Sequence, residues 1–290
     1  MKKLNYIGYN PNKLRYPSQI YSSHDLYRDI TMKHINYRGG SDYFQDKLPD
    51  FDRSNLIAYY PFIADLKDYS SNANHFTLDT TKGTTGHKPL FLPAQRNKAL
   101  YLQNTVYVAN HIAAWLLGTG NFTIMFWHHV NHQEQWGLAG LGTNSSLTAG
   151  FISKRTNDSN AGWEFYNNGT STQSGRMNFR ILNTDLVSST LVNTNKWTHY
   201  AVVRSGTSTN QTTMYVDGVV NKTGTFATNI TSTEKLKIGV SIHYNKFNIG
   251  SSVQHFIAAS RAWSINEIRE FINKTKGVPT TYVSSPPWDD

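Results

Sequence analysis

The sequence predicts an all-β protein: a two-sheet sandwich with an extended N-terminal arm and a short C-terminal helix. Three observations predict this class. From Leu56 onward, short runs of β-branched and aromatic residues alternate with clusters of Gly, Asn, Ser and Thr, as in strands joined by turns. Asp217-Gly218 stands between two such runs and favours a type I′ hairpin. Both faces of the run Trp197–Arg204 carry apolar side chains, which indicates a central strand.

Residues 1–52 are the predicted arm. Prolines and the pair Gly39-Gly40 interrupt any sustained period, so most of this segment reads as extended. Because such a segment cannot bury its own aromatic rings, we expect it to lie along its own sandwich or between neighbouring subunits. Tyrosine combines a large contact area with a polar tip, which suits partner contacts. The candidate partner-binding residues are Tyr6, Tyr9, Tyr16, Tyr21, Tyr27, Tyr37 and Tyr43.

The sandwich is expected over residues 53–278 and a C-terminal tail over 279–290. Its candidate strands are Leu56–Phe62, Leu100–Leu102, Val106–Val108, Phe122–Val130, Gly150–Lys154, Gly162–Tyr166, Met177–Leu182, Trp197–Arg204, Thr212–Val216, Lys235–Val240 and His255–Ala262. A turn is expected at Asn110–Leu117. The helix is expected at Ser264–Asn273, because Ser264 and Glu267 have the spacing of a capping box.

Composition excludes several classes of protein. Hydrophobic residues make up 38% of the 290 residues, which is enough for a buried core, and the absence of cysteine excludes disulfides and thiolate metal sites. The formal net charge is +9, but the Lys and Arg residues are scattered, so we expect no nucleic-acid partner. We expect no signal peptide and no membrane insertion, because the apolar runs fall far short of roughly 20 residues.

Several of these segments, in this order, resemble the laminin-G-like jelly-roll domain of the concanavalin A-like lectin/glucanase superfamily. They are Leu56–Phe62, Asp68–His75, Lys98–Leu102, Val106–Val108, Phe122–Trp127, Ile152–Lys154, Trp197–Arg204, Met214–Gly218, Leu236–Gly239 and Arg261–Ile268. The resemblance implies a two-sheet jelly roll. It also implies a Ca²⁺ site with oxygens from Asp68 and Asn72, but Gln254 and Ser71 depart from the family pattern, which puts the site in doubt. We expect no cofactor.

We expect no catalytic residues. Glucanases of the superfamily use paired glutamates, and retaining hydrolysis needs two carboxyl groups about 5 Å apart. In this sequence Glu134 and Glu164 are isolated, so the protein is expected not to be an enzyme.

No metal site is expected either. His128, His129 and His132 suggest zinc at first sight. A strand through them, however, points His128 and His129 to opposite faces. Trp136 and Trp163, nearer to predicted loops, are candidate ligand contacts, whereas Trp127 and Trp197 are expected to pack in strands.

Two functions are compatible with this pattern. The first is a structural protein of a bacteriophage virion, in a capsid decoration, fibre or tail, whose arm anchors it to other virion proteins or to copies of itself. The alternative is a carbohydrate-binding adhesion or recognition module, whose partners are cell-surface glycans. Fold alone does not decide between them.

Overall fold

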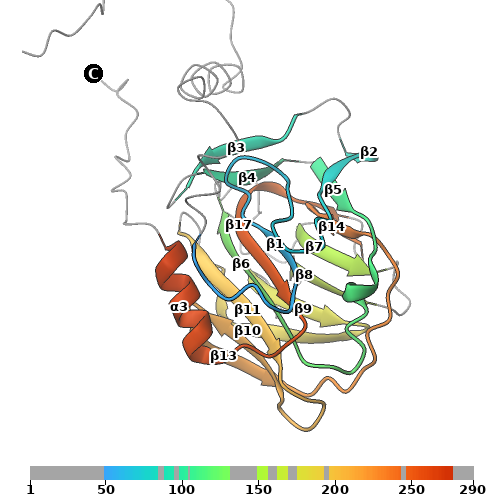
Figure 1. The fold of residues 1–290 in the computed structure, drawn as a ribbon, viewed down its shortest axis with the longest axis vertical. Coiled ribbons are helices and arrows are strands. Elements are labelled where there is room, and N and C mark those ends of the chain that lie inside the picture. The colour runs from blue at the N-terminus through green and yellow to red at the C-terminus, as the bar shows by residue number, and fades with distance from the viewer. Residues whose placement is uncertain are drawn as a thin grey trace, which may run out of the picture. The chain divides into compact units, whose positions relative to one another are not determined.

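Two antiparallel sheets pack face to face in the computed structural model of the protein (Figure 1). The structure describes residues 49–83, 88–94, 98–103, 105–130, 149–155, 162–168, 175–192, 196–242 and 246–276. All of them lie in one compact unit that begins at Pro49. The predicted arm up to residue 48 with its seven tyrosines, Trp136 and the predicted tail 279–290 lie outside the described residues.

The larger sheet has eight strands in the described residues, in the order β13-β12-β11-β6-β17-β4-β3, with β1 paired to β17. Their bounds are β1 Leu56–Tyr60, β3 Leu90–Pro93, β4 Lys98–Gln103, β6 Phe122–Val130, β11 Thr198–Arg204, β12 Thr212–Val216, β13 Val219–Gly224 and β17 Ile249–Ala259. We call it the eight-stranded sheet.

The second sheet has seven described strands in the order β10-β9-β8-β7-β14-β5-β2. Their bounds are β2 Thr77–Gly83, β5 Thr105–Ala109, β7 Ala149–Arg155, β8 Gly162–Asn168, β9 Arg176–Ile181, β10 Thr184–Leu191 and β14 Leu236–Ile238. A short ribbon of β15 (Val240–Ser241) and β16 (Lys246–Phe247) lies against β7, and η2 (Ala113–Trp115) is a single 3₁₀ turn. We call the larger part the seven-stranded sheet.

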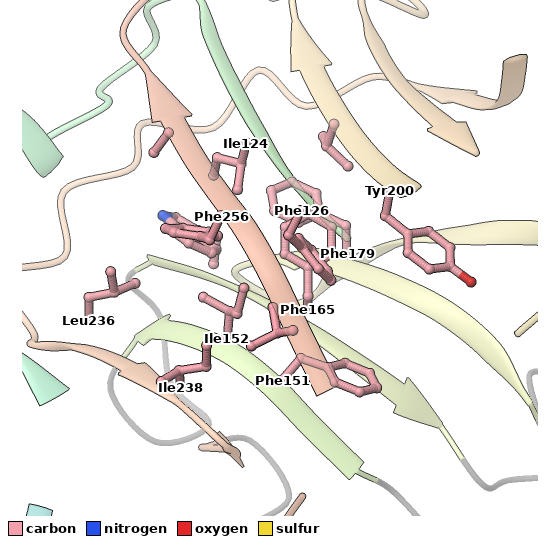
Figure 2. Packing of buried hydrophobic residues seen from close by; sticks show 14 of the residues in the cluster. Ile124, Phe126, Phe151, Ile152, Phe165, Phe179, Tyr200, Leu236, Ile238 and Phe256 are labelled. Atoms are coloured by element: carbon pink, nitrogen blue, oxygen red, sulfur yellow. The ribbon is translucent and has the colours of Figure 1, made fainter. Parts of the chain in front are cut away.

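The core lies between the two sheets and is rich in aromatic rings (Figure 2). Alternate residues of each strand point inward, so Ile124 and Phe126 of β6 meet Phe165 of β8 and Phe179 of β9. The Phe126 and Phe165 ring centroids are 5.0 Å apart and those of Phe165 and Phe179 are 4.7 Å apart. The predicted sandwich is therefore confirmed.

The central strand and the hairpin are confirmed as predicted. Every residue of β11 is buried, since β12 and β6 flank it and both its faces are covered. Asp217 and Gly218 have φ angles of 50° and 73°, the left-handed values that a type I′ turn requires at both positions. The turn joins β12 to β13.

The C-terminal helix α3 (Ile265–Thr275) covers part of the outer face of the eight-stranded sheet (Figure 1). Ser264 and Glu267 form the predicted capping box. The Trp127 Nε1–H donates to Thr275 Oγ1 at 2.8 Å, which ties the last turn of α3 to β6. Within the described ranges, no helix is long and apolar enough to cross a membrane.

Phe51 joins the chain before β1 to this helix layer. Its ring lies 5.2 Å from that of Tyr59 and 5.2 Å from that of Phe271, both edge-on. Phe51 falls within the arm predicted over residues 1–52, but its side chain packs against the sandwich.

Candidate functional site

The loop that follows β1 carries Asp68 and Asn72, the two residues considered for Ca²⁺. Asp68 Oδ1 accepts hydrogen bonds from the N–H groups of Tyr59 and Ser70, both at 2.9 Å. Its Oδ2 accepts from the Ser70 hydroxyl at 2.9 Å and from the Asn74 N–H at 3.0 Å. Four donors around one buried carboxylate do not fit a cation, which needs free oxygen lone pairs. The Asp68 carboxylate closes the loop instead.

Gln254, which stands where the family often has an acidic residue, also binds the chain itself. Its Nε2 donates to the Lys98 carbonyl oxygen at 2.7 Å. The Asn72 Nδ2 likewise donates to the Ile57 carbonyl oxygen at 2.9 Å. These side chains therefore hold neighbouring strands and the loop together.

His128 and His129 point to opposite faces of β6, as the strand geometry predicts. The His128 ring is buried in the core, 4.3 Å from the Phe151 ring. The His129 ring lies on the outer face, 5.2 Å from the Trp197 ring. His132 lies outside the described residues. His128 and His129 therefore do not converge on one ion.

Trp163 is a core residue. Its side chain is fully buried, with ring centroids 6.0 Å from Trp115 and 6.2 Å from both Phe165 and Phe179. The structure therefore assigns Trp163 to packing and not to the ligand contact considered from the sequence. The physical reason is the two-residue period of β8, which points Trp163 and Phe165 inward together.

The same period directs charged residues of the seven-stranded sheet to its outer face. A row of directly opposite residues crosses five strands, and we call it the polar row. Its members, from β14 to β10, are Lys237, Ser153, Glu164, Arg180 and Asp185. The charges in it alternate in sign: Arg180 lies between Glu164 and Asp185, and the uncharged Ser153 separates Lys237 from Glu164.

Glu164 is the buried centre of the polar row. Its Oε1 lies 3.3 Å from Arg155 Nη1, and both side chains are buried. Its Oε2 accepts from the Ser241 hydroxyl and from the Ile242 N–H, each at 3.2 Å. These partners come from β7 and from the β15 segment, so Glu164 links the sheet to the ribbon beside it.

Arg180 and Asp185 form one partly accessible end of the polar row, and Lys237 at the opposite end keeps 15% of its side-chain surface exposed. Arg180 Nε donates to Asp185 Oδ1 at 2.7 Å and its Nη2 to Oδ2 at 2.6 Å, a bidentate pair. Their side chains keep 10% and 15% of their surface exposed, so solvent reaches the pair. The Arg180 guanidinium carbon lies 5.3 Å from the centroid of the Tyr166 ring, a cation–π contact.

Stability alone is a weak reason for this arrangement. Burying a charged group costs several kcal/mol of hydration free energy per ion. Apolar residues of similar size often stabilise the folded state as well as a buried ion pair does. Polar residues on the outer face of a sheet are usually exposed to solvent. Departures from such a rule, like the buried charges here, are expected at functional sites. The polar row, with Arg155 and Tyr166, is therefore the candidate functional site.

Comparisons with known proteins agree with the fold. A family model described as the concanavalin A-like lectin/glucanases superfamily matches residues 103–268, a range that contains the whole polar row. No curated protein matches the sequence.

Solved structures with the same fold include toxin binding domains and an arabinanase domain. The binding domain of Paraclostridial Mosquitocidal Protein 1 is 17% identical with a TM-score of 0.58, covering 76% of this chain and 52% of that one. The binding domain of botulinum neurotoxin serotype D/C is 14% identical with a TM-score of 0.57, covering 77% and 53%. Domain 4 of AbnA, a GH43 extracellular arabinanase from Geobacillus stearothermophilus, in complex with arabinotriose, is 15% identical with a TM-score of 0.57, covering 74% and 97%.

At these identities the likeness shows the fold. The chain spans about half the length of the two toxin binding domains and nearly the whole of the arabinanase domain.

Proposed function

Because the chain belongs to the concanavalin A-like lectin/glucanases superfamily, we propose that it is a non-catalytic carbohydrate-binding recognition module. The observation that carries the proposal is the polar row on the outer face of the seven-stranded sheet. The arabinanase domain, which this chain matches over nearly its full length, is described in complex with arabinotriose, which supports a saccharide as the ligand class.

The chemistry of the polar row suits hydroxyl groups. Carboxylates accept hydrogen bonds from sugar hydroxyls and guanidinium groups donate to them, so alternating charges offer both functions in turn. Neighbouring strands are about 4.8 Å apart, so the five strands of the row span about 19 Å. Because Ser153 and Glu164 in the middle of the row are buried, a saccharide contacts the row at its partly exposed ends.

The residues of the site have different roles in this proposal. Arg180 and Asp185 contact the ligand, because they keep exposed surface. Glu164 and Arg155 are buried and position the row from below. Tyr166 holds the Arg180 guanidinium flat, since the ring and the cation attract one another.

The absence of catalysis is part of the proposal. In the polar row Arg180 stands between Glu164 and Asp185, so the two carboxylates do not face one another across an open space. Each is engaged by a guanidinium group. A glycosidase instead needs one carboxyl group as acid and one as nucleophile or base on either side of the sugar bond.

The experiment is a glycan array probed with the full chain, with arabinotriose among the saccharides. We expect a defined set of oligosaccharides to bind, and Arg180→Lys to lose them, because lysine keeps the charge but not the bidentate geometry. The matched control is Lys222→Ala, which removes an exposed cation from β13 of the other sheet and should leave binding unchanged. Equal binding by Arg180→Lys and the wild type would refute the site.

A virion assembly role stays a prediction from the sequence. It depends on the tyrosine-rich arm, of which residues 1–48 lie outside the described part of the chain. The proposal places the arm in contact with other virion proteins and the protein itself in the particle. Comparing full-length protein with a form lacking residues 1–48 tests it: loss of incorporation into a larger assembly supports the role, and retained incorporation contradicts it.

A further inference from the structure

Trp197 differs from the other described tryptophans in its exposure. Trp115, Trp127, Trp163 and Trp263 are buried, whereas Trp197 is half-buried. Trp197 directly precedes β11, whereas the sequence predicts that it packs within a strand. A partly solvated indole exposes apolar surface, and in soluble proteins such surface is often a contact site.

The ring of Trp197 lies on the outer face of the eight-stranded sheet beside a histidine. The centroids of the Trp197 and His129 rings are 5.2 Å apart, with planes inclined by 39°. His129 is opposite Ser252 of β17, which is opposite Tyr101 of β4. Ser252 and Tyr101 are buried, so the partly exposed surface at this place is that of Trp197 and His129.

Helix α3 ends just before the Trp197–His129 pair. The helix follows β6 from Thr123, whose hydroxyl accepts from the Trp263 N–H at 2.9 Å, to Trp127, whose indole binds Thr275 at 2.8 Å. Thr275 is the last residue of α3. His129 is the next outward-facing residue of β6 after Trp127, so the helix does not extend over it.

Lys196, the residue before Trp197 in the chain, belongs to an exposed ion pair. Lys196 Nζ lies 3.2 Å from Asp217 Oδ2, and their side chains are 61% and 37% exposed. Asp217 is held in the type I′ turn, and its Oδ1 accepts from the His199 N–H at 2.9 Å. The Asp217 carboxylate is thus fixed through Oδ1 while Oδ2 pairs with Lys196. Lys196 and Asp217 compensate one another in charge.

We propose that Trp197, His129, Lys196 and Asp217 form a second saccharide subsite, on the sheet opposite to the polar row. The apolar C–H face of a sugar ring stacks on the indole, and the Lys196–Asp217 pair binds the hydroxyls at its edge. The balanced charges of the Lys196–Asp217 pair favour a neutral sugar over an acidic one. This inference rests on carbohydrate binding as the function but not on the polar row.

The test uses full-length protein labelled with 5-fluorotryptophan and observed by fluorine NMR. The Trp197 resonance is assigned by its loss in Trp197→Phe, a variant whose thermal unfolding is compared with the wild type. Neutral oligosaccharides, including arabinotriose, lactose and maltotriose, should shift this resonance. Trp197→Ala should bind the saccharide that shifts this resonance about tenfold more weakly than the wild type does. Asp217→Asn keeps the turn and the Oδ1 acceptor, so it should reduce the affinity for this saccharide less than Trp197→Ala does.

The two sites fail in different ways. One outcome is that Arg180→Lys loses the binding seen on the array and that no neutral saccharide shifts the Trp197 resonance. This outcome supports the polar row and overturns the subsite. A shift that persists in Arg180→Lys supports the subsite even if the polar row does not bind. Removing residues 277–290 tests a different occupant: if the truncation shifts the resonance and no saccharide does, the C-terminal tail occupies the ring and the subsite is refuted.

Discussion

Acidification from pH 7 to pH 5 should destabilise the sandwich because it buries the imidazoles of His128 and His199. His199 lies beneath α3, its ring 5.1 Å from that of Trp127 and 6.1 Å from that of Phe271. Among the described residues, neither of its ring nitrogens has a hydrogen-bond partner. His128 is buried in the core beside Phe151. Burial lowers the pKa of both histidines to about 3, with a neighbouring histidine adding to the effect in each case.

The direction and size of the effect follow from proton linkage. In the unfolded chain a histidine has a pKa of about 6.5 and takes up a proton as the pH falls below that value. The folded chain keeps these imidazoles neutral down to about pH 3. The unfolded state therefore gains protons that the folded state does not, and stability is lost through this window. Between pH 7 and pH 5 the loss is about 2 kcal/mol for each histidine.

Urea unfolding at the two pH values measures this loss. His199→Leu, which cannot titrate, should lose about 2 kcal/mol less than the wild type between pH 7 and pH 5. The carboxylates titrate in both proteins, so their contribution to the pH dependence cancels when the variant is compared with the wild type. An unchanged pH dependence in His199→Leu would refute the assignment of His199 as a neutral buried imidazole.

Three further changes test the fold around the sites. Asp68→Ala leaves buried N–H donors without an acceptor and should cost about 2–3 kcal/mol in urea unfolding, whereas added Ca²⁺ should not raise the melting temperature of the wild type; a rise would contradict the closed loop. Gly218→Ala places a side chain at a φ of 73° and 3.0 Å from Arg269 Cγ, so we expect a loss of about 1–2 kcal/mol, with Lys222→Ala as the neutral control. Phe51→Ala removes a ring packed on Tyr59 and Phe271 and should lower the free energy of unfolding by about 2 kcal/mol; no loss would show that the contact does not form in solution.

Local sequence signals predicted the elements whose cause is local. The strand at Phe122–Val130 has the predicted bounds, since its apolar residues fill both faces. Ser264 and Glu267 mark the start of α3 by the hydrogen bonds that they exchange. Asp217-Gly218 marks its hairpin by its tolerance of positive φ.

Elements with mixed or polar patterns were not predicted. Strand β10 has Ser188 and Thr190 where a regular strand would show apolar residues, and it forms the edge of its sheet. Its pairing to β9 comes from the tertiary fold, so Asp185 was not recognised as the partner of Arg180. Cross-strand register brings Lys237 and Glu164 into one row, and no local period reports it.

Trp163 was misjudged although a signal was present. In the run from Gly162 to Asn168, tryptophan and Phe165 alternate with Glu164 and Tyr166. The alternation separates a core face from a polar face, and it would have placed Trp163 inside and Glu164 in the candidate site. The two-residue alternation predicts the position of Trp163 better than its proximity to a predicted loop does.

The central claim is that the polar row binds a saccharide, and isothermal titration calorimetry tests it most directly. A saccharide bound by the full chain on the array is titrated into the wild type, Arg180→Lys and Lys222→Ala. The proposal predicts that Arg180→Lys binds at least about tenfold more weakly and that Lys222→Ala binds like the wild type. Equal affinities of Arg180→Lys and the wild type would contradict it.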